Sequence, residues 1–96
     1  MEKTFRFRIY TEFKDNLFEL VSRYFPGFVI IRGIGVWKGE REAAAVIEIL
    51  APEDALQKIA FLAGDISVVN KQEEVLVAFE ETSLLFFGAE ASAVAD

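Results

Sequence analysis

The sequence predicts a single α+β domain in which two helices cover one face of an antiparallel sheet. Three observations lead to this prediction: an alternating apolar segment near the start, two segments with helical spacing, and a glycine-containing turn between two β-rich runs. The chain has 96 residues, the usual size of one compact domain. Hydrophobic residues make up 53% of it and ten are Phe, so it can build a packed core.

The first predicted element is a strand over residues 4–10. Its side chains alternate between an apolar set, Phe5, Phe7 and Ile9, and a second set, Arg6, Arg8 and Tyr10. Such alternation is typical of a strand with one buried face. A helix is then predicted over residues 14–25, because apolar residues recur at helical spacing and Pro26 and Gly27 follow as a stop signal.

A hairpin is predicted next, with strands over residues 28–37 and 41–51. The first run is rich in β-branched residues, and the second carries apolar side chains on alternate positions: Ala43, Ala45, Ile47 and Ile49. Lys38, Gly39 and Glu40 lie between the two runs and supply the turn.

The second helix is predicted from Pro52 to about Val69, with Asn70 ending it. Proline and the two acidic residues after it are favourable in a first helical turn. A further strand follows, in which Val75, Val77 and Phe79 alternate with other residues. The apolar run over residues 83–87 leaves an additional edge strand open, so we expect a domain over residues 1–87 and a frayed tail over residues 88–96.

This order of elements predicts a ferredoxin-like βαββαβ sandwich with both helices on one face of the sheet. The other face, called the open face below, is left without a cover. Since the first and third strands are neighbours in this topology, Arg6 and Arg8 should lie on the open face beside Glu48. Tyr10, Val46 and Leu50 should join them there.

The second strand presents a choice of face for Arg32. A two-residue turn would place Arg32 on the helix side, where an unpaired charge would cost several kcal/mol. We therefore expect an odd-length loop or a bulge at Gly33–Gly35, which puts Ile30, Arg32 and Ile34 on the open face. An apolar face of this size favours burial in a homodimer or by a partner protein, although a last strand or tail folding over it would serve as well.

Composition excludes several classes of function. The chain has no Cys and no His, which rules out thiolate nucleophiles, Cys/His zinc sites and imidazole catalysis. Its net charge of −6 disfavours nucleic acid as a partner. No apolar stretch is long enough for a membrane-spanning helix, and no secretion signal opens the chain, so we expect a cytoplasmic protein. No cofactor or metal is predicted, and the carboxylates are expected to be solvated charge.

The candidate ligand or interface residues are Arg6, Arg8, Tyr10, Arg32, Ile34, Trp37, Val46 and Glu48. The three arginines have the forked donors that recognise carboxylate or phosphate, but Glu48 offers them a partner within the chain. The glycine-rich tract around Trp37 could cradle an anion through its backbone. It could equally be a bulged strand and hairpin, and no catalytic residue is predicted.

Several segments resemble small uncharacterised proteins of phages and prophages: residues 5–12, 24–28, 33–42, 46–49 and 72–77. The resemblance implies a mobile-element accessory protein that binds or inhibits a host protein or sequesters a small molecule. Three functions stay open. They are a non-enzymatic homo-oligomeric binding module, a sensor of an anionic metabolite or nucleotide at an arginine-lined subunit junction, and a cofactor-independent enzyme of the dimeric α+β-barrel type.

Overall fold

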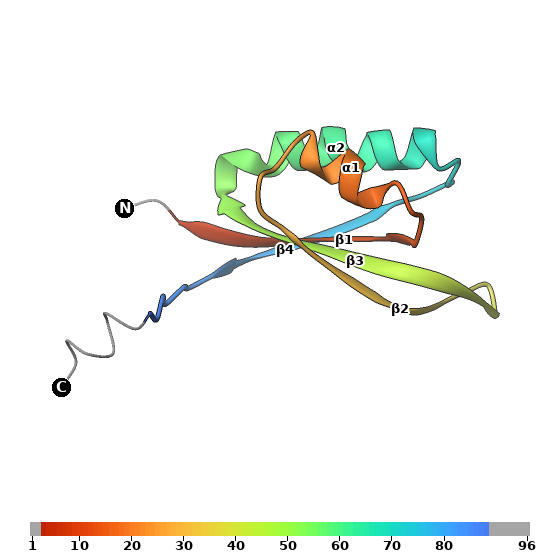
Figure 1. The fold of residues 1–96 in the computed structure, drawn as a ribbon, viewed down its shortest axis with the longest axis horizontal. Coiled ribbons are helices and arrows are strands. Elements are labelled where there is room, and N and C mark those ends of the chain that lie inside the picture. Colours follow the sequence, from red (N-terminus) through yellow and green to blue (C-terminus); the bar gives the residue numbers. More distant parts are fainter. Residues whose placement is uncertain (1–2, 89–96) are drawn as a thin grey trace.

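The computed structural model describes residues 3–88 as a four-stranded antiparallel sheet with two helices on one side (Figure 1). The elements are β1 (Thr4–Glu12), α1 (Leu17–Ser22), β2 (Val29–Trp37), β3 (Glu40–Pro52), a short 3-10 helix η1 (Glu53–Ala55), α2 (Leu56–Val69) and β4 (Leu76–Thr82). The strand order is β2-β3-β1-β4. The predicted α+β architecture, with both helices covering one face, is confirmed.

The core lies between the sheet and the helices and follows the predicted alternation. Phe7 and Ile9 of β1 and Ile47 and Ile49 of β3 are each at most 1% exposed. The helices cover them with a second set of buried side chains: Leu17, Leu20, Val21, Ile59, Leu62 and Ile66. Because side chains alternate along a strand, this burial places the intervening residues of β1 and β3 on the open face.

Helix α1 is shorter than the helix predicted over residues 14–25. Hydrogen-bonded turns flank it, with the Leu17 amide donating to the Lys14 carbonyl at 3.2 Å and the Tyr24 amide to the Val21 carbonyl at 2.9 Å. These turns continue the helical path of the chain beyond both ends of α1. The apolar residues therefore keep helical spacing over a longer stretch, which led to the prediction of a longer helix. Helix α2 ends at Val69, with Asn70 as its C-cap, as predicted.

Two polar contacts hold the α1 region against α2. The Asn16 side-chain amide donates to the Asn70 side-chain oxygen at 2.7 Å, and the Tyr24 hydroxyl donates to the Asp65 carboxylate. The hydrogen bond to Asp65 raises the pKa of Tyr24, because the neutral phenol is the donor. Both ends of the short helix are thereby fixed to the longer one.

The hairpin turn has two residues, and the predicted odd-length loop or bulge is wrong. Lys38 and Gly39 have φ values of 51° and 80°, as a tight hairpin turn of two residues requires. The resulting register places Arg32 opposite Ala45 and Ile34 opposite Ala43, on the helix side. Ile30, opposite Ile47, lies on that side too.

Arg32 avoids the expected desolvation cost because β2 is an edge strand. Its side chain is exposed, and its guanidinium lies 3.9 Å from the centroid of the Phe13 ring. Figure 1 shows the β2–β3 hairpin extending past the helices, so the helix side of the sheet is not a buried side at this position. Stacking on Phe13 lets the charge keep its contact with water.

Strand β4 ends at Thr82, which is level with the first residue of its neighbour β1. Thr82 lies opposite Thr4, so a continuation of β4 would have no β1 residue to pair with. Residues 83–88 accordingly form no strand, and the additional edge strand left open for residues 83–87 is absent. Of the expected frayed tail over residues 88–96, all but Gly88 lies outside the described residues.

Candidate functional site

The open face carries one apolar row that crosses all four strands. Ile31 lies opposite Val46, Val46 opposite Tyr10, and Tyr10 opposite Leu76. Ile31 and Leu76 at the ends of the row are 52% and 64% exposed. We call these four residues the apolar row.

An ion-pair group lies next to the apolar row, toward the N-terminal end of β1. The Arg8 Nε donates to Glu48 Oε1 at 3.0 Å, and the Arg6 Nε lies 3.7 Å from the same oxygen. Arg6 also donates to the Glu80 carboxylate at 3.2 Å. The hydrogen bond that Arg8 donates to Glu48 raises the pKa of Arg8. Both arginines therefore already have carboxylate partners, as expected for Glu48, and do not present uncompensated charge to an anion.

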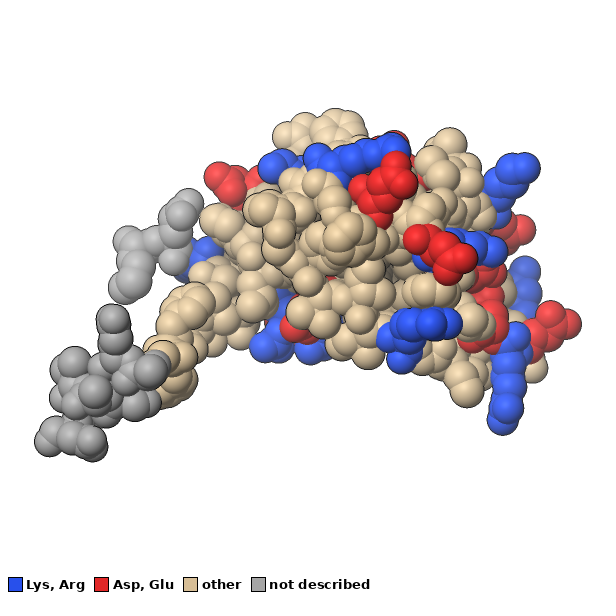
Figure 2. Space-filling view, viewed as in Figure 1, with Lys and Arg blue, Asp and Glu red and all other residues tan. Residues whose placement is uncertain are grey.

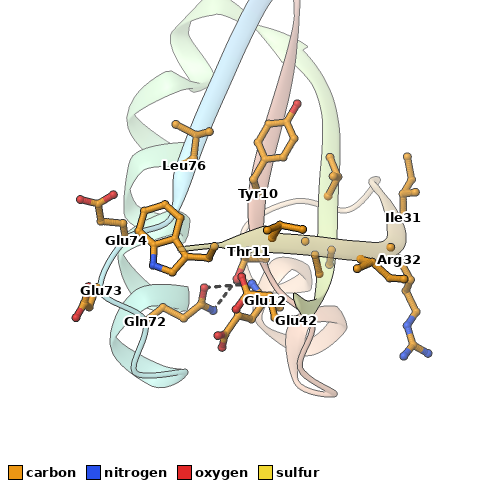
Figure 3. Close-up of a pocket in the computed structure, with 18 of the residues that line it drawn as sticks. Tyr10, Thr11, Glu12, Ile31, Arg32, Glu42, Gln72, Glu73, Glu74 and Leu76 are labelled. Atoms are coloured by element: carbon orange, nitrogen blue, oxygen red, sulfur yellow. Dashed lines mark hydrogen bonds between the residues drawn. The ribbon is translucent and has the colours of Figure 1, made fainter. Parts of the chain in front are cut away.

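A cavity of about 720 Å³ lies over the apolar row on its other side, toward the hairpin. We call it the hairpin cavity. Its lining includes all four residues of the apolar row, Gly33, Gly35 and Trp37 of β2, and residues 71–74. Gly33 and Gly35 share the face of Ile31 and carry no side chain, and above Gly33 the space over the sheet is open. Figure 3 shows Tyr10 and Leu76 from neighbouring strands at this site.

The charged groups of the hairpin cavity are mainly acidic. Four carboxylates line it, Glu12, Glu42, Glu73 and Glu74, against three basic groups, those of Lys38, Lys71 and Arg32. In Figure 3 the Arg32 side chain points to the other side of β2 from Ile31, away from these carboxylates. Figure 2 shows acidic and basic side chains side by side at the hairpin end of the molecule.

Glu42 and Glu12 come from neighbouring strands and interact directly. A hydrogen bond between their carboxyl groups raises the pKa of Glu42, and burial and the negative charge of Glu12 act in the same direction. Two adjacent carboxyl groups hold a proton more readily than separate ones. Glu42 therefore keeps its proton to a higher pH than a separate carboxyl group would.

Gln72 fixes the loop that forms one wall of the hairpin cavity. Its side-chain amide donates to Thr11 Oγ1 at 2.6 Å, and its side-chain oxygen accepts from the Glu12 amide at 3.2 Å (Figure 3). Its backbone carbonyl also accepts from Ser67 Oγ at 2.7 Å. The first two hydrogen bonds join the segment before β4 to the end of β1, and the third joins it to α2, so this wall is held in place by the protein itself.

The predicted site residues divide into three groups. Tyr10, Trp37 and Val46 line the hairpin cavity, whereas Arg6, Arg8 and Glu48 form the ion-pair group. Arg32 and Ile34, predicted on the open face, also belong to the lining of the hairpin cavity, but the register places them on the helix side. The structure therefore does not bring the three arginines together.

Sequence reasoning missed the carboxylates of the cavity and Gln72. The carboxylates are expected from the sequence to be solvated charge, and nothing near these residues in the sequence indicates that they meet. The spacing of Gly33 and Gly35 is the one signal that could have located the cavity. Two glycines two residues apart leave one face of a strand without side chains at two successive positions.

Within residues 3–88, neither helix has the length and apolar character needed to cross a membrane. The same residues bring no three carboxylates together in an arrangement suited to a metal ion.

Comparison with known proteins gives structural neighbours without a sequence family. No family model and no curated protein matches the chain. A DUF3240 family protein from Shewanella baltica OS155 superposes with a TM-score of 0.66 at 14% identity, over 93% of this chain and 100% of that one. A phage SAM lyase in its apo state superposes with a TM-score of 0.61 at 19% identity, over 82% of this chain and 81% of that one. At these identities the likeness concerns the fold alone.

Proposed function

We propose that the protein is a small-molecule-binding module that holds its ligand in the hairpin cavity. The cavity itself carries the proposal, since its volume of about 720 Å³ lies within the usual range of ligand sites. Its apolar floor and few polar walls are typical of such sites. We also infer that the fold is ferredoxin-like, on the strand order β2-β3-β1-β4 and the two helices on one side.

The lining favours an organic cation with a flat ring over the anionic metabolite or nucleotide considered from the sequence. Four carboxylates outnumber the three basic side chains of the lining, Arg32, Lys38 and Lys71, which disfavours an anion. Trp37 and Tyr10 offer aromatic faces to a planar or cationic group. The ammonium of Lys38, 5.9 Å from the centroid of the Trp37 ring, already occupies such a position.

S-adenosylmethionine (SAM) is the first ligand to test. The phage protein with a similar fold is a SAM lyase by name. SAM combines a flat adenine ring with a positively charged sulfonium group, which is the chemistry that the acidic and aromatic lining supports. The neutral thioether S-adenosylhomocysteine has the same ring without the sulfonium charge and serves as the matched probe.

The decisive experiment is thermal unfolding of the full chain with each probe. At a SAM concentration of about 100 times the dissociation constant, binding should stabilise the fold by about 2.7 kcal/mol and raise Tm by roughly 10–20 °C. S-adenosylhomocysteine should give a smaller shift and ATP none. Gly33→Leu, which places a side chain into the cavity, should abolish the shift, and Gly64→Ala on the surface of α2 should retain it. The absence of a shift with SAM, or an undiminished shift in Gly33→Leu, would refute the proposal.

Binding without turnover is the expected outcome of a parallel incubation with SAM. Recovery of intact SAM, measured by mass spectrometry, is expected for a non-enzymatic module. Conversion of SAM that disappears in Gly33→Leu would instead support the cofactor-independent enzyme.

A protein-binding role for the rest of the open face is a second candidate. Val29, Leu50 and the outer residues of the apolar row are each at least 46% exposed on that face. We propose that a second copy or a host protein covers them, as in a phage accessory protein. Val29→Asp should then abolish capture of that partner, or lower the mass measured by light scattering, while the circular dichroism spectrum stays unchanged. An unchanged mass together with unchanged capture would exclude this use of the face.

A further inference from the structure

Two features at the end of the sheet farthest from the hairpin have no partner within residues 3–88. The first is one edge of β3 beyond residue 48. The second is the apolar segment that follows β4, residues 84–87, called the tail segment below. Neither belongs to the hairpin cavity.

The β3 edge is unpaired because β2 is the shorter strand. On one side, β3 pairs with β1 as far as Pro52, opposite Thr4. On the other side, its pairing with β2 ends at Glu48, opposite Val29. Residues 49–52 therefore offer four residues of strand edge without a neighbour in the described chain. Backbone groups on such an edge are ready to pair with another extended segment.

A groove of about 590 Å³ runs beside this edge. We call it the edge groove. Its lining is mostly apolar or small: Phe25, Pro26, Gly27, Ile49, Leu50, Ala51, Pro52, Asp54, Ala55 and Lys58. The loop before β2 forms one wall and the start of α2 another. An extended segment placed there would contact apolar side chains as well as the strand edge.

The tail segment has the composition that such a groove requires. Leu85, Phe86 and Phe87 are 82–85% exposed, so these large apolar side chains make few contacts with the described part of their own chain. Residues 83–88 carry no charge. Figure 1 shows the chain leading away from the sheet after β4.

We propose that the tail segment of one copy docks in the edge groove of a second copy and adds a strand to β3. The segment does not fill the groove of its own chain, since Leu85, Phe86 and Phe87 are largely exposed. Its direction away from the body points to another molecule. Main-chain hydrogen bonds to the edge supply affinity, and the apolar side chains supply fit.

The composition of the chain favours a second copy as the donor. Each copy carries one tail segment and one edge groove. In a closed dimer or ring, each copy donates its tail segment to a neighbour, so that every tail segment is covered and every groove is filled. Two chains of net charge −6 repel each other, and an uncharged segment makes the contact without adding to that repulsion.

Light scattering of the full chain and two matched variants tests the assembly. The parent should have the mass of a closed oligomer, and Phe86→Asp should weaken association by about a hundredfold and give single chains. Phe61→Asp is the control, because Phe61 is also a largely exposed phenylalanine but lies on α2. A monomeric parent, or equal masses for the parent and Phe86→Asp, would overturn the proposal.

Disulfide trapping tests the docking site itself. Because the chain has no Cys of its own, any disulfide that forms must involve the engineered cysteines. A chain with Ala55→Cys, mixed with a chain carrying Gly88→Cys, should form a mixed disulfide at least about tenfold faster than the control pair Lys38→Cys with Gly88→Cys. Equal rates for the two pairs would mean that the tail segment does not occupy the edge groove.

Discussion

Two glycines on the same face of β2 should respond in opposite ways to the same substitution. Gly33 and Gly35 both lie on the open face, two residues apart. A Cβ on Gly33 would have no described heavy atom beyond its chain neighbours within 4 Å, whereas a Cβ on Gly35 would lie 3.1 Å from the Cβ of Ala44. The first position has open space above it, and the second is closely packed.

The magnitudes follow from this difference in space. Gly33→Val restricts the unfolded chain and places a β-branched residue in a strand, so it should stabilise the fold by about 0.5–1 kcal/mol. Gly35→Val must displace Ala44 or the backbone, which costs about 1–3 kcal/mol. The two variants should therefore differ in free energy of unfolding by about 1.5–4 kcal/mol, or roughly 6–30 °C in Tm.

Urea unfolding of the parent and both variants measures this difference. The dependence of the free energy on urea should be the same in all three, because neither change alters the surface exposed on unfolding. Equal stabilities of the two variants, or a Gly35→Val that is the more stable, would refute the placement of these glycines on the cavity face.

Three further variants test the helices and the acidic pair. Gly64→Ala, at an exposed position of α2 where a Cβ meets nothing described within 4 Å, should stabilise the fold by about 1 kcal/mol in urea unfolding. Ile59→Ala, at a fully buried position, should destabilise it by about 2–5 kcal/mol in the same measurement. For Glu42, the raised pKa means that the folded chain holds this proton to a higher pH than the unfolded chain. Stability should thus fall as the pH rises from the ordinary range of a Glu, about 4.3, through the raised pKa. Glu42→Gln should remove this fall, so unfolding curves of parent and variant should diverge in favour of the variant as the pH increases.

The architecture could be predicted because its strongest patterns coincide with burial. Phe7 and Ile9 alternate with charged residues on a central strand. Such a strand has one fully covered face, so the apolar positions of the alternating pattern are the buried ones. The same holds for Ile47 on β3. Register between the two strands then follows, and it places Glu48 beside Arg8.

The face on which the β2 side chains lie could not be predicted, because the prediction took the helix side of the sheet to be buried and this does not hold on the edge strand β2. A charge on the helix side of a central strand is buried, but Arg32 on β2 reaches solvent past the helices and stacks on Phe13. Treating the helix side as uniformly buried led to the wrong choice of turn. The acidic lining of the cavity could not be predicted for a different reason, which is that its residues are far apart in the sequence. Glu12 and Gln72, for example, meet through a hydrogen bond from the Glu12 amide to the Gln72 side chain.

The two polar contacts between the helices make α1 dependent on α2. A helix of six residues is too short to persist by itself in water. With one end of its segment tied through Asn16 and the other through Tyr24, it gains order from the longer helix, and a local opening of one requires the loss of bonds to the other. The helical layer therefore behaves as one cooperative unit, so that thermal motion on that side of the sheet involves both helices together.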